Sequence, residues 1–371
     1  MKASTIAAIF VFILSSLFVH SQNLSGTNLD DFIDAVIKKN NIPGLSIAVV
    51  TNDSVIYAKG FGIKKTGGSD PVDEHTLFEA VSLTKSFTAL ILGMLVDQEK
   101  IKWTDLVVKY IPDFETNEDF VTQKLTIQDL LTLRSGLLDG DKLSGSTRME
   151  LVPQIRNLKI SDSFRLSQTS YNLNYTLAGL IVEIISGESW ENMMKERIFS
   201  SLKMSETYTN IPAALSFNNF STPHFVKDGN IVPAQWRDYS IYSPAEGVYS
   251  NVVDLAKWIK LQLNNGTFEN HSIISPGTLA DMQKPQNIAM DLFKEYFNPE
   301  ANFMTMGTGW FISDYKNLKI IQMGGLSSGT SNLITIIPSK KIGIIIQANK
   351  GFVFDSFVKI NYKIFKIQGI C

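Results

Sequence analysis

The chain is organised around one stretch, which reads Thr76-Leu-Phe-Glu-Ala-Val-Ser-Leu-Thr-Lys-Ser-Phe-Thr-Ala-Leu-Ile-Leu-Gly-Met-Leu-Val-Asp97. From Phe87 to Val96 the side chains are apolar almost all the way round a helix, which is typical of a helix buried in a large core. Ser82 and Lys85 come just ahead of this apolar segment. Residues three apart lie on the same face of a helix, so the sequence predicts a hydroxyl beside an amine at the beginning of a buried helix.

This pair of side chains indicates a nucleophile and its base. A serine hydroxyl is a weak nucleophile until a neighbouring base takes its proton. Lysine can be that base only if its pKa falls by roughly three units from about 10.4, through burial and nearby positive charge. A helix N-terminus supplies part of that field, and its free N–H groups can stabilise an oxyanion. The pattern Ser-x-x-Lys alone is weak evidence, because it begins at four places: Ser82, Ser200, Ser313 and Ser356. Only Ser82 stands at the head of the most apolar helix.

Length and composition describe a globular protein with ample material for a core, in one large domain or two interleaved ones. The 371 residues are 44% hydrophobic and 19% charged, with a formal net charge of −2. This charge gives no reason to expect nucleic acid as a partner. The one cysteine, Cys371, leaves no internal disulfide and no thiolate metal cluster. The four histidines lack zinc-binding spacing, so we expect no metal and no cofactor.

The N-terminus has the pattern of an export signal, residues 1–21. Lys2 supplies a positive charge, residues 6–19 form a nearly unbroken apolar run, and Val19-His20-Ser21 resembles a small-residue cleavage site. We expect cleavage after Ser21 and a secreted or periplasmic protein, residues 22–371, without stable membrane insertion. The alternative is an uncleaved anchor, although about fourteen apolar residues fall short of the roughly twenty that a span needs.

Strand-like runs near both ends of the chain bracket a helical middle. These runs are residues 45–50, 54–59, 308–312, 318–322, 331–337 and 341–348. Helices and turns prevail between them, from about residue 99 to about residue 300. The predicted fold class is therefore α+β: one antiparallel sheet formed from both chain ends and flanked by helices, with an inserted, mainly helical lobe. A cleft between the lobes would place Ser82 at their junction.

Several stretches are similar to those of one known superfamily. The main ones are Ile42-Pro-Gly-Leu-Ser-Ile-Ala-Val-Val50, Phe78-Glu-Ala-Val-Ser-Leu-Thr-Lys85, Leu130-Leu-Thr-Leu-Arg-Ser-Gly-Leu137 and Pro244-Ala-Glu-Gly-Val-Tyr-Ser250. With the order of elements, they resemble the serine β-lactamase and penicillin-binding protein superfamily. The most similar branch holds class C β-lactamases, DD-peptidases and related esterases. The resemblance extends over roughly residues 29 to 365 and implies a β-lactamase/transpeptidase-like fold.

The superfamily uses three active-site elements, and the resemblance implies residues for the first two. The first, Ser-x-x-Lys, is intact at Ser82 and Lys85. The second, Tyr-x-Asn or Ser-x-Asn ahead of a Tyr-x-Leu-x-Gly helix, falls on Ser170-Tyr171-Asn172. A tyrosine usually stands first in this branch, so Ser170 is a departure; Tyr171 would take its place if the loop is shifted by one residue. The alternative interpretation is that Ser170 and Asn172 are turn formers before a helix.

The third element is normally Lys or His, then Thr or Ser, then Gly, and the matching stretch is Met323-Gly324-Gly325. A backbone N–H near Leu326 can still face the reacting carbonyl beside that of Ser82, because a main-chain oxyanion hole does not depend on side-chain type. Met323 carries no charge and Gly324 no hydroxyl, although the superfamily holds a substrate carboxylate with these groups. We therefore expect impaired recognition of D-Ala-D-Ala peptides and penicillins. Nearby, a leucine at position 133 stands where the branch often has histidine, and we expect it only to pack.

The sequence favours a secreted serine hydrolase that forms an acyl-Ser82 intermediate with an uncharged ester or amide, from a small-molecule or peptide substrate. Lys85 would be the general base, Ser170 or Tyr171 would pass the proton to the leaving group, and Asn172 would bond Lys85 or the substrate amide. The rival hypothesis is a binding protein that kept the fold and lost turnover, because two motifs depart from the usual form. Acyl transfer to an amine stays open beside hydrolysis, and no pattern indicates the oligomeric state.

Overall fold

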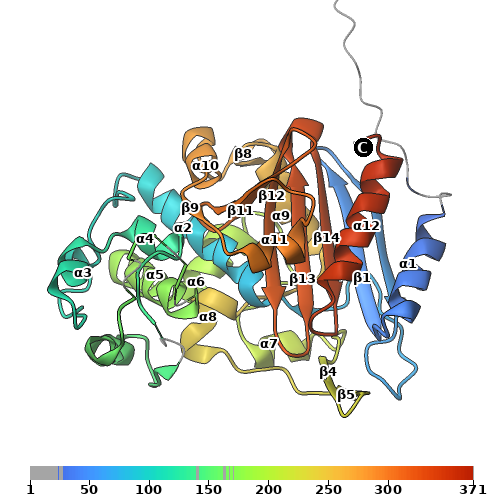
Figure 1. Cartoon of the computed structure of the whole chain (residues 1–371), viewed down its shortest axis with the longest axis horizontal. Coiled ribbons are helices and arrows are strands. Elements are labelled where there is room, and N and C mark those ends of the chain that lie inside the picture. Colours follow the sequence, from blue (N-terminus) through green and yellow to red (C-terminus); the bar gives the residue numbers. More distant parts are fainter. Residues whose placement is uncertain are drawn as a thin grey trace, which may run out of the picture.

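The computed structural model describes residue 24 and residues 28–138, 142–161, 164–166, 168–169 and 171–370. The expected export signal and Ser170 lie outside these residues. At the centre is an eight-stranded sheet with the order β2-β1-β14-β13-β12-β11-β10-β9, and every neighbouring pair in it is antiparallel. Figure 1 shows this sheet on the right of the molecule, with most helices of the middle of the chain on the left.

The sheet combines strands from both ends of the chain, as predicted. β1 (Gly44–Thr51) pairs with β2 (Val55–Gly62) on one side and with β14 (Ile342–Ala348) on the other, so that Leu45 lies opposite Ala348. The remaining strands are β9 (Asn287–Ile288), β10 (Met304–Met306), β11 (Phe311–Tyr315), β12 (Leu318–Leu326) and β13 (Ser331–Ile337). This arrangement confirms the α+β fold class.

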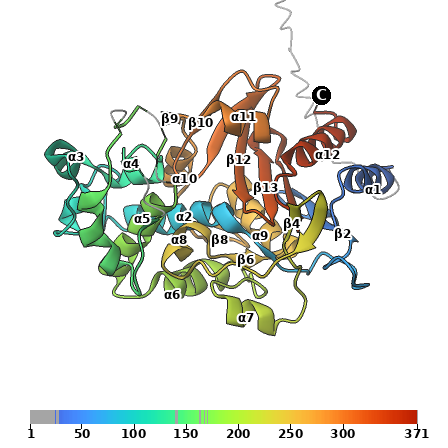
Figure 2. The ribbon, with the colours of Figure 1, turned by 60° about the horizontal axis from the view of Figure 1, so that its bottom comes forward.

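Helices cover both faces of the sheet, which explains why β13 and β14 are buried along their whole length. On one face, α12 (Phe354–Ile367) packs against β13, and α1 (Leu29–Lys39) and α11 (Asp291–Phe297) pack against α12. On the opposite face lies α9 (Val252–Leu263), against β1 and β14. Figure 2 shows α1 and α12 side by side at the edge of the molecule. Gly343 faces α9 so closely that a Cβ atom would lie 2.3 Å from Ile259.

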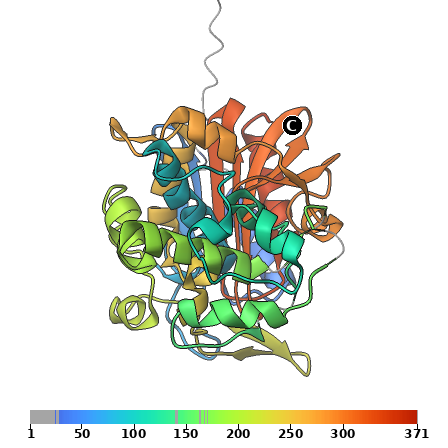
Figure 3. The same ribbon diagram turned by 90° about the vertical axis from the view of Figure 1, so that its left-hand side faces the viewer.

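The middle of the chain supplies the other helices. They are α3 (Asp119–Lys124), α4 (Ile127–Leu131), α5 (Tyr171–Ser186), α6 (Trp190–Met194), α7 (Ile211–Ser216), α8 (Ser243–Glu246) and α10 (Pro276–Met282). In Figure 3, seen from their side, α3 to α5 stand in front of the sheet. The chain returns to the sheet at Asn287, earlier than the expected lobe boundary near residue 300. The division into two lobes at those boundaries stays a prediction.

The helix that organises the sequence, α2 (Thr84–Asp97), is buried from Thr84 to Leu95 and so has no solvent-facing stripe there. Phe87 stacks on Trp258 of α9 with ring centroids 4.0 Å apart. On another side, Gly309 has a left-handed φ of +80° and touches α2, where a Cβ atom would lie 2.6 Å from that of Ala89. The apolar pattern is therefore explained, because α2 contacts neighbours on every side.

Candidate active site

Ser82 lies in a short 3₁₀ turn, Val81–Leu83, directly ahead of α2. We expected Ser82 on the first turn of an α-helix; the tighter 3₁₀ turn also brings residues i and i+3 together, so the predicted neighbourhood with Lys85 is kept. Val81 has a φ of 49°, in the left-handed region that β-branched residues avoid. Such a conformation costs roughly 1–2 kcal/mol and occurs preferentially at functional sites.

The amine of Lys85 is buried among oxygen atoms. Its Nζ donates to Ser82 Oγ at 2.8 Å, to Asn172 Oδ1 at 2.9 Å and to the backbone oxygen of Ala245 at 3.3 Å. The face of the Tyr175 ring lies 5.9 Å away, measured to its centroid. Only 2% of Lys85 is exposed to solvent. The structure thus brings together Ser82, Lys85 and Asn172, as the sequence predicted, and adds a carbonyl that no side-chain pattern could reveal.

The second element stands at the beginning of α5. Asn172 is the second residue of that helix, and Tyr175 one turn later donates its hydroxyl to Leu131 O at 2.6 Å, which fixes the helix start against α4. Ser170 lies outside the described residues, and only the backbone of Tyr171 is described. Which hydroxyl stands next to Lys85 in the relay therefore stays a prediction.

The third element brings the main chain of β12 against the Ser82 turn. A Cβ atom on Gly325 would lie 2.2 Å from Ala80 O, so only glycine permits this approach. The N–H of Ser327 donates to Thr330 O at 2.9 Å. Since hydrogen-bonded and non-hydrogen-bonded pairs alternate in an antiparallel ladder, the next pair, Leu326 with Ser331, directs its N–H groups away from each other. The N–H of Leu326 therefore points to the side of β12 on which β11 lies. The pairing of β11 with β12 extends only as far as Gln322, so Leu326 lies beyond its end.

An aromatic ring fills the space next to Gly324, where the resemblance would place a hydroxyl side chain. A Cβ atom on Gly324 would lie 2.3 Å from Cζ of Phe297, which belongs to α11. Met323, at the position of the usual cation, is buried. Sequence reasoning missed Phe297, because it stands 27 residues earlier in the chain than Gly324 and belongs to no motif.

A cavity of about 270 Å³ opens beside Ser82. Its described lining residues are mostly aromatic or aliphatic: Ser82, Lys85, Leu133, Leu292, Phe293, Tyr296, Phe297, Phe311, Met323, Gly324, Leu326, Phe352 and Phe354. Leu133, for which we expected only packing, is part of this wall, and its φ is 59°. Gly325 is not among the lining residues, whereas Leu326 is.

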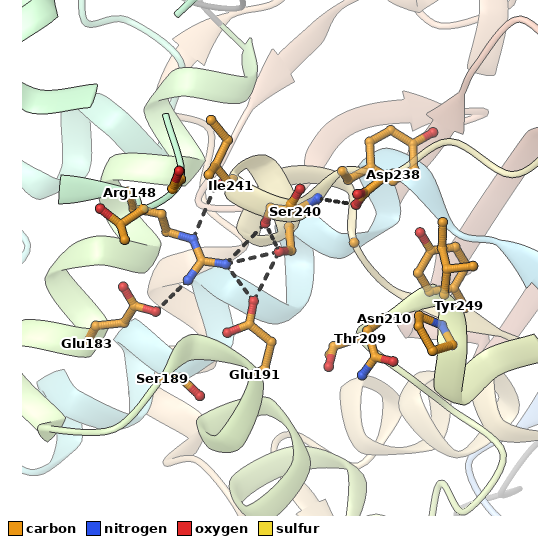
Figure 4. Close-up of a pocket in the computed structure, with 17 residues that line it drawn as sticks. Arg148, Glu183, Ser189, Glu191, Thr209, Asn210, Asp238, Ser240, Ile241 and Tyr249 are labelled. Carbon is orange, nitrogen blue, oxygen red and sulfur yellow. Dashed lines mark hydrogen bonds and ion pairs between the residues drawn. The ribbon is translucent and has the colours of Figure 1, made fainter. Parts of the chain in front are cut away.

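A larger cavity, of about 740 Å³, lies beside the segment that leads into α8, and Figure 4 shows Arg148 at its side. The guanidinium of Arg148 pairs with Glu183 and with Glu191, and donates to Ser243 Oγ at 3.0 Å and to Ile241 O at 3.2 Å. The two cavities share no described lining residue. Arg148 therefore braces the segment whose Ala245 oxygen bonds Lys85.

Three residues ahead of Ser82 in the chain lies a buried carboxyl group, that of Glu79 in β3 (Phe78–Glu79). It accepts hydrogen bonds from the N–H of Arg237 at 2.8 Å and from Thr330 Oγ1 at 3.0 Å. Burial raises the pKa of Glu79 from 4.5 to about 7. Asn332 Nδ2 donates to the backbone oxygen of Glu79 at 2.8 Å, which ties β13 to the turn.

Within the described residues, no group of three or more His, Cys, Asp or Glu side chains is placed to hold a metal ion. In the same part of the chain, none of the helices combines the length and apolar character that crossing a membrane requires.

Comparison with known proteins places this geometry in a family. The family model named Beta-lactamase matches residues 29–368, and the chain belongs to this family. The chain is 27% identical over 340 residues to the unguisins hydrolase ungD of Aspergillus violaceofuscus, and 24% identical over 343 residues to protein flp of Staphylococcus aureus. These alignments cover 84% and 88% of this chain, but only 59% and 64% of the two relatives.

A solved structure shows the same fold. It is that of the octameric penicillin-binding protein homologue from Pyrococcus abyssi, with a TM-score of 0.79, 25% identity, and coverage of 92% of this chain and 77% of that chain. The predicted resemblance to the serine β-lactamase and penicillin-binding protein superfamily is thus confirmed.

Proposed function

We propose that the protein is a serine hydrolase that forms an acyl-Ser82 intermediate with an uncharged ester or amide and releases the acyl group to water. The observation that carries the proposal is the distance of 2.8 Å between Ser82 Oγ and Lys85 Nζ, at a lysine that is almost completely buried. The name of the relative from Aspergillus violaceofuscus, a hydrolase, supports the same class of reaction.

The contacts of Lys85 explain how it would act as a base. Asn172 Oδ1 and Ala245 O are carbonyl oxygens, which accept hydrogen bonds and cannot donate them. A neutral Lys85 would keep these two N–H bonds and direct its lone pair to Ser82. The two carbonyls therefore orient the amine, and Lys85 Nζ would take the proton of the Ser82 hydroxyl.

The reaction would then run in two halves. Ser82 Oγ attacks the substrate carbonyl carbon, and the N–H groups of Ser82 and Leu326 stabilise the oxyanion, with Gly325 allowing the close approach. The bond to the leaving alcohol or amine breaks as that group receives the proton through Ser170 or Tyr171. A water molecule next attacks the acyl-Ser82 carbonyl, and the proton that water loses returns to Ser82 Oγ.

The proposal includes export of the protein. The pattern of residues 1–21 supports cleavage after Ser21 and a secreted or periplasmic location. Expression of the full chain in a bacterial host, followed by N-terminal sequencing of the extracytoplasmic fraction, tests this. The expected first residue is Gln22, and an intact Met1 in the cytoplasm would contradict it.

The decisive experiment identifies the nucleophile and the activity together. The purified protein is incubated with a fluorophosphonate probe, and the peptide that contains Ser82 is examined by mass spectrometry. We expect a mass shift on this peptide, hydrolysis of a p-nitrophenyl ester, and loss of both in a folded Ser82→Ala variant. No adduct and equal ester rates in the two proteins would favour a binding protein. Product that forms only when an amine is added would indicate acyl transfer.

A further inference from the structure

We propose that the cavity beside Ser82 binds an apolar, uncharged substituent of the substrate and that Phe297 determines this specificity. The inference deepens the proposed function and rests on it, because it names the substrate class of the same site. It follows from the wall of the cavity, from the charges that the wall lacks, and from the side chains at its mouth.

Aromatic rings from three elements form the wall. Phe293 and Phe297 of α11 lie 4.7 Å and 5.4 Å from the ring of Phe311 in β11, measured between centroids. Phe354, at the beginning of α12, lies 5.1 Å from Phe297. These rings hold one another in place, so the wall is formed before a ligand arrives. A preformed apolar wall with a few polar groups at one end is typical of a small-molecule site.

The cavity offers no place for a carboxylate. Among its described lining residues, Lys85 is the one basic side chain; its amine donates to Ser82, Asn172 and Ala245 and is neutral in the proposed mechanism. A substrate carboxylate that entered would lose its water among aromatic rings and would meet no cation on this described wall, which is unfavourable. Phe297 also occupies the space next to Gly324 where a hydroxyl side chain would begin. The same ring therefore removes a polar contact and supplies an apolar one.

Two large apolar side chains stand at the mouth of the cavity. Leu292 is 42% exposed and Phe352 is 67% exposed, although both line it. Phe352 has a φ of 60°, in the left-handed region that a bulky residue avoids. The preceding Gly351 abuts the turn after β12, since a Cβ atom there would lie 2.4 Å from Ser328 O. The backbone of Phe352 thus keeps an unfavourable conformation next to a tightly packed glycine, and its exposed ring stands at the entrance, where an apolar ligand would cover it.

The size of the cavity limits the substituent. About 270 Å³ lies just below the range of roughly 300–1,000 Å³ that is usual for small-ligand sites. The geometry therefore points to one aromatic ring or a short alkyl chain, with longer chains stopped at Phe297.

Two ester series test the proposal. In the first, the acyl group of p-nitrophenyl esters lengthens from acetyl to decanoyl; in the second, the alcohol of acetate esters lengthens in the same way. In the series whose variable group enters the cavity, we expect kcat/KM to rise about fourfold for each buried methylene, up to an optimum. A carboxylate at the end of the chain should lower kcat/KM at least tenfold relative to the methyl-terminated ester of equal length.

The variant Phe297→Ala should move the optimum to longer chains, whereas Phe120→Ala, an exposed phenylalanine of α3 outside the cavity, should leave it in place. Thermal melting and fluorophosphonate labelling confirm that each variant is folded. If Phe297→Ala does not fold, Leu292→Ala and Phe352→Ala at the mouth should flatten the chain-length profile instead.

The outcomes separate the two proposals. If Ser82 is labelled but kcat/KM does not change with chain length in either ester series, the apolar site is wrong and the proposed hydrolase is unaffected. The same conclusion follows if the carboxylate ester and the methyl-terminated ester of equal length have equal kcat/KM. If the parent protein shows neither ester turnover nor labelling of Ser82, the proposed hydrolase is wrong. In that case, calorimetry with the Ser82→Ala protein still tests the cavity, with N-hexylacetamide and N-methylhexanamide each compared with N-methylacetamide. Tighter binding of either longer amide supports the apolar site, and equal or absent binding of both contradicts it.

Discussion

The side chain of Lys85 reaches the backbone oxygen of Ala245, at 3.3 Å, across 160 residues of sequence. The same amine touches Ser82 and Asn172, so three separate segments of the chain meet at one nitrogen atom. Lys85 is consequently part of both the proposed chemistry and the packing of α8 against α2. Replacing it tests the two roles at once.

Lys85→Met should lower kcat for a p-nitrophenyl ester by about 10²–10⁴-fold, because the general base is lost. The carbonyl oxygens of Asn172 and Ala245 would lose one donor, so the free energy of unfolding should fall by about 1–3 kcal/mol. Steady-state kinetics and urea unfolding measure the two effects. A folded variant with the parent rate would show that Lys85 is not the base.

Asn172→Asp should change the pH profile more than the structure. A carboxylate 2.9 Å from the amine would favour the charged form of Lys85 and so raise the pH at which it becomes a base. The rate at pH 7 should fall and recover toward alkaline pH. The measurement is kcat/KM from pH 6 to pH 10, with Asn192→Asp on the exposed side of α6 as the matched control. An unshifted profile contradicts the prediction.

Glu79 should make the protein less stable as the pH rises. Its pKa is about 7 in the folded chain and 4.5 as the ordinary value, so the folded state holds the proton more tightly. This stabilisation is fully present below pH 4.5 and is lost as the pH rises through 7. The total is up to about 3 kcal/mol for a shift of this size. Glu79→Gln should remove this part of the pH dependence in urea unfolding between pH 5 and pH 8. A variant whose stability follows that of the parent at every pH would refute it.

Arg148→Met should loosen the segment that leads into α8. The change leaves Glu183 and Glu191 without their cation and Ser243 without its donor, so unfolding should become easier by about 2 kcal/mol. The matched control is Lys203→Met, which breaks an ion pair on the exposed surface and should change stability by less than about 1 kcal/mol. If the free energy of unfolding falls equally in the two variants, Arg148 does not stabilise this segment more than a surface ion pair would. Thermal unfolding measures both.

Gly325→Ala should impair turnover more than stability. A Cβ atom there must move away from Ala80 O, so β12 and the N–H of Leu326 would shift from the Ser82 turn. We expect at least a tenfold loss in kcat/KM, in line with the loss of one oxyanion donor. Gly277→Ala, where a Cβ atom meets nothing closer than 3.9 Å, is the control and should keep the parent rate. Parent-like kinetics in both variants would argue against a main-chain oxyanion site at β12.

The sequence was sufficient for elements that have a strong local pattern. β13 begins and ends where the strand-like run at residues 331–337 predicts, and Lys85 lies beside Ser82 because the spacing of three residues survives in a 3₁₀ turn. The strand expected at residues 308–312 begins only at Phe311, since Gly309 turns against α2 instead. β9 is too short, at two residues, to produce a pattern.

Other parts of the site depend on contacts between distant segments. Phe297 meets Gly324, and Arg148 meets Ser243, through the packing of helices on a strand or a loop. The residues that flank Phe297 and Arg148 in the sequence do not indicate these contacts. A family resemblance assigns roles only to residues that belong to a motif. The carbonyl of Ala245 is a backbone group, so its identity as an acceptor is independent of the residue type. Such contacts become visible only when the chain is folded.

The pairing of β1 with β14 has a consequence for biosynthesis. Leu45 cannot find its partner until Ala348 has left the ribosome, so about three hundred residues must be synthesised while β1 has only the β2 hairpin as a neighbour. A ribosome stalled before residue 342 would therefore carry a chain with an open edge at β1, prone to joining with other chains.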